Sequence, residues 1–183
     1  MIQLSKKGQA HEINLQKSQY SNTDKSIRVK MTWETAIDLD LHAFVVDEKN
    51  SYSQIFFAHK LSKCGNILLD QDAGVGNVAG DNQENLYVKD YTKVKKIVFA
   101  ANIFRFFGNL FSSSDNFSKY NGKIHIKSLG NDISVHLNSK EYGRWALIAL
   151  FEVTVDGPRV TNLDSILKSK PTEDFIKKMG FHN

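Results

Sequence analysis

The sequence predicts a mainly β protein, an antiparallel β-sandwich with short C-terminal helices. Two observations lead to this prediction: apolar and polar residues alternate in many short stretches, and helix-start signals appear in the tail. Many short strands followed by small helices are typical of a sandwich with a helical appendage. The 183 residues are enough for one domain with a full core. We expect a single domain over residues 1–183, with a core at about 1–156 and the appendage at about 161–180.

The clearest strand signals lie in residues 26–33 and 38–46. In the first stretch, the apolar positions of one face are Ile27, Val29, Met31 and Trp33. In the second stretch, the apolar face carries Leu39, Leu41, Ala43 and Val45. Because side chains alternate along a strand, Asp38, Asp40 and His42 are expected on the opposite face. Two carboxylates two residues apart at the start of a strand can share one cation.

The remaining strands are predicted from shorter patterns. Separate strands are expected at residues 1–4, 12–15, 86–88 and 145–155. Hairpins are expected for residues 54–58 with 66–69, and for 123–127 with 132–137 around Gly130-Asn131. Residues 95–104 are almost uniformly apolar in their centre, which predicts a strand buried on both faces. The Phe-rich residues 105–119 have no clear period and are expected to form a loop at one end of the sandwich.

Two signals predict helices in the tail. Thr161–Asp164 resembles a capping box that opens a short helix. Pro171 is placed at the start of a second helix, and Gly180 fits its end. The apolar residues between these signals would dock on the sheets.

Residues 70–84 form an acidic, glycine-containing stretch with no apolar periodicity, which predicts a loop. Its carboxylates are Asp70, Asp72, Asp81 and Glu84, and it also holds three glycines and two asparagines. Crowded carboxylates repel one another, and a hard cation removes that cost. Ca²⁺ takes about six to eight oxygen ligands from carboxylates, amides and backbone carbonyls. The stretch therefore predicts an oxygen-lined metal site, with Ca²⁺ as the ion.

Charge is distributed unevenly along the chain. The net charge is +4, yet residues 34–85 contain nine acidic residues and three lysines. A strongly acidic segment in a basic protein fits a cation site better than a uniform surface for nucleic acid. The alternative is that these acids are solvated loop residues with no ligand. The lysine clusters are not interleaved with aromatic residues, so nucleic-acid binding is not expected.

Composition and motifs exclude several functional classes. The single cysteine, Cys64, allows no internal disulfide and favours a reducing compartment. We find no signal-peptide pattern and no run of roughly 20 apolar residues, so a soluble cytoplasmic protein is expected. The histidines show no metal-ligand spacing, and no nucleophile motif is present. The protein is therefore not expected to be an enzyme.

The order of short motifs resembles the TerD-type tellurium-resistance and stress-protein family. The motifs that carry the resemblance are Leu4–Gly8, Val29–Trp33 followed by Ile37–Asp40, Ile55–Phe57, Cys64–Ile67, Val94–Phe99 and Gly143–Trp145. Within the acidic stretch, Asp72, Gly76, Gly80 and Asp81 fall at the spacing of the family's glycine-rich acidic loop. The similarity covers Met1 to about Phe151.

The resemblance implies a β-sandwich that binds one or two Ca²⁺ ions in a stress-response or tellurite-resistance context. The carboxylate ligands that it implies are Asp38, Asp40, Asp72, Asp81 and Glu84. Asn82 stands where the family usually has a second Asp, and Gln71 and Ala73 replace the family's Gly and Asn.

We therefore expect a non-enzymatic calcium-binding protein that acts as a binding or signalling module, with protein partners and no membrane span. Its predicted metal-site residues are Asp38, Asp40, Asp70, Asp72, Gly76, Gly80, Asp81, Asn82 and Glu84. The alternative is a metal-free interaction or scaffold module that has lost part of the calcium site. Such a module would use the basic remainder of the chain or the Phe-rich region 104–117.

Overall fold

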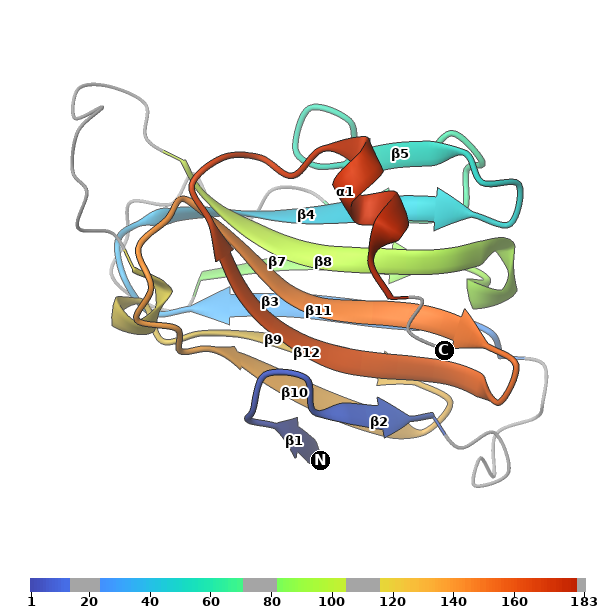
Figure 1. The fold of residues 1–183 in the computed structure, drawn as a ribbon, viewed down its shortest axis with the longest axis horizontal. Coiled ribbons are helices and arrows are strands. Elements are labelled where there is room, and N and C mark those ends of the chain that lie inside the picture. Colours follow the sequence, from blue (N-terminus) through green and yellow to red (C-terminus); the bar gives the residue numbers. More distant parts are fainter. Residues whose placement is uncertain (14–23, 71–81, 105–115, 181–183) are drawn as a thin grey trace.

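The computed structural model describes residues 1–13, 24–70, 82–104 and 116–180, which form two facing six-stranded sheets (Figure 1). Sheet A contains, in spatial order, β1 (Ile2–Leu4), β10 (Asn131–Leu137), β9 (Gly122–Ser128), β3 (Ile27–Trp33), β7 (Asn82–Val88) and β6 (Ile67–Leu69). Sheet B contains β2 (Ala10–Glu12), β12 (Gly157–Leu167), β11 (Trp145–Thr154), β8 (Val94–Phe104), β4 (Asp38–Asp47) and β5 (Tyr52–Ile55). Among these strands, only β1 and β10 pair in parallel. The predicted antiparallel β-sandwich is confirmed.

The core lies between the two sheets. The alternating apolar side chains of β3 are almost completely buried there, as the sequence predicts. The inward side chains of β4 belong to the same core. Because two strands from different sheets contribute alternate residues to one core, their polar residues are directed to the outer faces of the sandwich. The hairpin of β9 and β10 also forms as predicted.

The C-terminal helix α1 (Glu173–Lys178) packs on the outer face of sheet B, as Figure 1 shows. Ile176 of α1 is fully buried in a second apolar cluster that includes Phe44 and Val98. The Lys96 Nζ donates hydrogen bonds to the backbone carbonyls of Lys177 and Met179 at the end of the helix. Strand β8 is therefore buried on both faces, as its apolar run predicts.

The first predicted tail helix is wrong. Thr161–Asp164 lies within β12, which pairs with β11 along most of its length and with β2 near its start. The Asn162 side chain donates to the Leu4 carbonyl, so it supports strand pairing instead of a helix. A capping-box pattern is a local signal, and pairing with two strands overrides it. The sheet therefore extends to Leu167, beyond the expected limit at 156, and one helix forms in place of two.

The predicted hairpin of residues 54–58 with 66–69 is also wrong. Strand β5 pairs with β4 in sheet B, whereas β6 pairs with β7 in sheet A. The segment between β5 and β6 therefore passes from sheet B to sheet A.

The predicted loop 70–84 is wrong at its end, since residues 82–84 begin β7. The predicted Phe-rich loop lies mostly outside the described residues. No helix in the described ranges is long and apolar enough to cross a membrane.

Candidate functional site

The first candidate site lies at the end of the sandwich where β4 and β7 begin. The Trp33 indole donates to the Ile37 carbonyl at 2.7 Å, which closes the turn between β3 and β4. The Asn82 side-chain amide donates to the Thr35 carbonyl at 3.1 Å, so the first residue of β7 holds the same turn. These two bonds fix the position at which Asp38 enters sheet B.

The Glu84 carboxylate connects the two sheets at this end. Glu84 is only 3% exposed, and its Oε2 accepts a hydrogen bond from the Leu41 backbone N–H at 2.5 Å. Strand β5 pairs only with Ala43–Val46, so within the described residues the first half of β4 has no strand on that side. The buried carboxylate of Glu84 satisfies a backbone donor that would otherwise be buried without a partner.

The two aspartates of β4 lie beside this contact. Asp40 is 6% exposed and directly precedes Leu41, while Asp38 is half-buried. By strand alternation, both belong to the outer side of sheet B, whereas Leu41 and the Glu84 carboxylate belong to the inner side. The structure thus brings the Asp38–Asp40 strand and Glu84 to the same end, with carboxylates on both sides of the β4 backbone.

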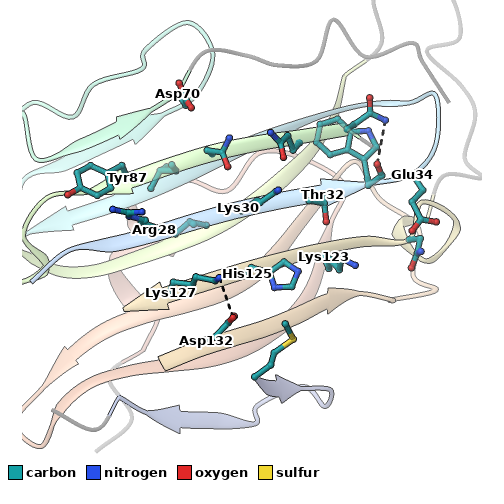
Figure 2. Close-up of a pocket in the computed structure, with 18 of the residues that line it drawn as sticks. Arg28, Lys30, Thr32, Glu34, Asp70, Tyr87, Lys123, His125, Lys127 and Asp132 are labelled. Carbon is teal, nitrogen blue, oxygen red and sulfur yellow. Dashed lines mark hydrogen bonds and ion pairs between the residues drawn. The ribbon is translucent and has the colours of Figure 1, made fainter. Parts of the chain in front are cut away.

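Asp70 does not join this group. Its backbone N–H donates to the Asn85 carbonyl at 2.8 Å, and its side chain is at the upper edge of the outer face of sheet A in Figure 2. The predicted residues Asp72, Gly76, Gly80 and Asp81 lie outside the described residues. Within the described ranges, no three Asp, Glu, His or Cys side chains are grouped so that they could hold a metal.

His42, on the same strand face as Asp40, is part of an aromatic cluster. Its ring lies 4.7 Å from that of Trp145 and 5.4 Å from that of Phe56, and Nδ1 contacts the Gln54 amide at 3.0 Å. Burial, with a smaller contribution from the charge of Lys170, lowers the pKa of His42 to about 3. The ring is therefore neutral at pH 7 and packs as an aromatic core residue.

The second candidate site is the outer face of sheet A, which we call the basic face and define by the outward side chains of β3, β7 and β9 (Figure 2). It is hollowed, with a volume of about 920 Å³. Its cations are Arg28, Lys30, Lys123 and Lys127. Among the described elements, none packs over this face, in contrast to the covered outer face of sheet B.

Sequence reasoning missed the basic face. The alternation in residues 26–33 and 123–127 already directs these four cations away from the core. The sequence does not reveal which strands are neighbours in the sheet: β3 pairs with β9, although about 90 residues separate them along the chain. Only this long-range pairing collects the four cations on one surface.

The chain matches no protein-family model and no curated protein. The resemblance to the TerD-type family stays a prediction that rests on the sequence motifs.

Proposed function

We propose that this chain is a non-enzymatic calcium-binding module of the TerD type that acts in the cytoplasm through partner binding, in a stress-response or tellurite-resistance context. The observation that best supports the proposal is the Glu84–Leu41 hydrogen bond, which places a buried carboxylate against the strand that carries Asp38 and Asp40. Asp38 and Asp40 on the outer side of β4 and Glu84 on its inner side lie at the same end of the sandwich, although the described residues do not gather the three carboxylates into one group.

The chemistry of the donor set fits a hard cation. Asp38, Asp40 and Glu84 supply carboxylate oxygens and Asn82 an amide, all of which Ca²⁺ accepts as ligands. The described residues do not complete such a site by themselves. The proposal therefore assigns the remaining ligands to Asp72 and Asp81 of the acidic stretch. When bound, the ion would neutralise these carboxylates and stabilise the folded state.

A thermal melt of the full chain in EGTA, compared with melts in Ca²⁺ and in Mg²⁺, tests the proposal. At about 100 times its dissociation constant, the ion adds roughly 2.7 kcal/mol of stability. For a domain of this size, that corresponds to an increase in Tm of about 5–10 °C. The increase should be selective for Ca²⁺ and should disappear in Asp72→Ala and in Asp81→Ala.

Asp156→Ala is the matched control, because Asp156 is an exposed acid in the β11–β12 turn. It should keep the full Ca²⁺ response. If the folded wild-type protein shows no change in Tm at millimolar Ca²⁺, the calcium proposal is wrong.

The second candidate is the metal-free interaction module. The specific observation in its favour is the basic face, a hollow surface lined by Arg28, Lys30 and Lys123. A protein that does not respond to Ca²⁺ but binds a ligand through this face would support the second candidate.

A further inference from the structure

The side chains of the basic face form three rows that cross β7, β3 and β9. The strand register places Tyr87 beside Arg28 and Arg28 beside Lys127 in the first row. The second row contains Asn85, Lys30 and His125, and the third contains Gln83, Thr32 and Lys123. Neighbouring strands are about 4.8 Å apart, and successive outward residues on one strand are about 6.7 Å apart. The face is therefore a closely spaced array of donors.

Most cations of this array form no ion pair with a described acid, and Arg28 interacts electrostatically with Asp24. Lys127 forms an ion pair with Asp132, with its Nζ 3.5 Å from Oδ2. Arg28, Lys30 and Lys123 form no ion pair with any acid in the described ranges. Arg28 and Lys127 are direct cross-strand neighbours, and the Asp132 carboxylate offsets the charge of Lys127. An anionic ligand would pair with the remaining cations.

The acidic residues of the hollow lie at its margins. In Figure 2, Asp70, Glu34 and Asp132 are at three edges, whereas Arg28, Lys30 and Lys123 lie between them. An anion along the centre of the face would lie nearest to these cations, with Asp132 paired to Lys127 at the margin.

Polar groups without charge complete the surface. The amides of Asn85 and Gln83 lie on the same rows as Lys30 and Lys123 and line the hollow. Tyr87, which is 38% exposed, borders it beside Arg28. Amide groups donate to and accept from the hydroxyls of a sugar, and an aromatic ring can pack on its face.

We propose that the basic face binds an acidic oligosaccharide, whose carboxylate or sulfate groups pair with Arg28, Lys30 and Lys123. A peptide that adds a strand needs an exposed sheet edge, whereas this surface is the face of a sheet. Single-stranded nucleic acid is favoured by several stacked aromatic side chains, whereas this hollow has Tyr87 at its border and a buried indole, Trp33. The inference rests on the binding role proposed above but not on calcium.

The experiment is calorimetric titration of the full chain with hexagalacturonate, with neutral maltohexaose and with a short oligo-dT, each in EGTA and again in Ca²⁺. We expect binding of hexagalacturonate, no detectable binding of maltohexaose, and weaker binding of oligo-dT. The affinity for hexagalacturonate should fall as salt is raised, because surface charge interactions are screened. Binding should be present in EGTA, and this titration decides the proposal independently of the calcium test, because Ca²⁺ itself binds the carboxylates of hexagalacturonate.

The decisive variant is Lys30→Glu combined with Lys123→Glu. It should weaken hexagalacturonate binding by at least about tenfold, because hydrogen bonds to charged groups contribute about 1.5–3 kcal/mol each. The matched control is Lys140→Glu combined with Lys168→Glu, which makes the same change in net charge at two exposed positions outside the hollow. The control should bind nearly as well as the wild type.

Asn85→Ala tests the amides separately, because Asn85 lines the hollow beside Lys30. We expect binding to weaken severalfold, because a hydrogen-bonding group of the surface is removed. The proposal is wrong if hexagalacturonate does not bind, if the control pair weakens binding as much as the test pair, or if oligo-dT binds more tightly.

Discussion

Substitutions of Glu84 can separate a structural role of its carboxylate from a metal-binding role. Glu84→Gln keeps the length and shape of the side chain and can still accept the Leu41 N–H through its amide oxygen. It replaces a charge-assisted hydrogen bond by a neutral one. Hydrogen bonds to charged groups contribute about 1.5–3 kcal/mol, and neutral ones about 0.5–1.5 kcal/mol. We therefore expect a loss of about 1 kcal/mol in EGTA.

Glu84→Leu should cost more, because it removes the acceptor and leaves the Leu41 N–H without this bond. A buried donor without a partner costs about 1–3 kcal/mol. Chemical denaturation in EGTA would measure both variants against Glu141→Gln, a control at an exposed glutamate. The expected order of stability is wild type and control first, then Glu84→Gln, then Glu84→Leu.

The same variants measured in Ca²⁺ test the second role. If Glu84 is a calcium ligand, Glu84→Gln should also lose most of the increase in stability that Ca²⁺ gives the wild type. A wild-type Ca²⁺ response in Glu84→Gln would remove Glu84 from the ligand set. Equal stability of Glu84→Gln and Glu84→Leu in EGTA would refute the argument that this carboxylate satisfies the backbone of β4.

Three further predictions concern sheet B. Lys96→Met should expose α1 to limited proteolysis before global unfolding, because the lysine ammonium bonds the carbonyls at the helix end. Gly180→Ala should also loosen the tail: its φ is +88°, and a Cβ would lie 2.8 Å from a Leu150 methyl carbon, so the Tm should fall by a few degrees. The lowered pKa of His42 means that, below pH about 6.5, the unfolded chain takes up a proton that the folded chain does not. Stability should therefore fall by about 2 kcal/mol between pH 6.5 and 5, and denaturation of His42→Gln should show a flatter dependence on pH.

The sequence predicted what depends on local periodicity. The alternation in residues 26–33 identified β3 and its buried face, and the uniformly apolar centre of residues 95–104 identified a strand covered on both sides. These predictions hold because the period of two is imposed by the strand backbone itself. The same local reasoning failed for Thr161–Asp164, whose capping-box pattern is compatible with a helix but which pairs with β11 in a hairpin and with β2, a strand distant in sequence.

The candidate metal site was predictable only in part. The spacing of Asp38 and Asp40 on one strand face follows from alternation. That Glu84 would be buried against Leu41 does not follow, because it depends on where β5 stops pairing with β4. Asp70 belongs to the same acidic stretch as Glu84, so the sequence groups the two residues. In the structure, the Asp70 backbone N–H bonds the Asn85 carbonyl, and the Asp70 side chain lies on the outer face of sheet A.

The two outer faces of the sandwich differ in a way that bears on function. The outer face of sheet B carries an apolar cluster that the chain covers with its own helix, and Ile176 of that helix is buried in the cluster. Sheet A presents Arg28, Lys30 and Lys123, which form no ion pair in the described ranges, and no described element covers them. The fourth cation, Lys127, is paired with Asp132. A ligand that supplies negative charge would complement the other three cations, which makes sheet A, and not the helix-covered sheet B, the surface on which binding should first be measured.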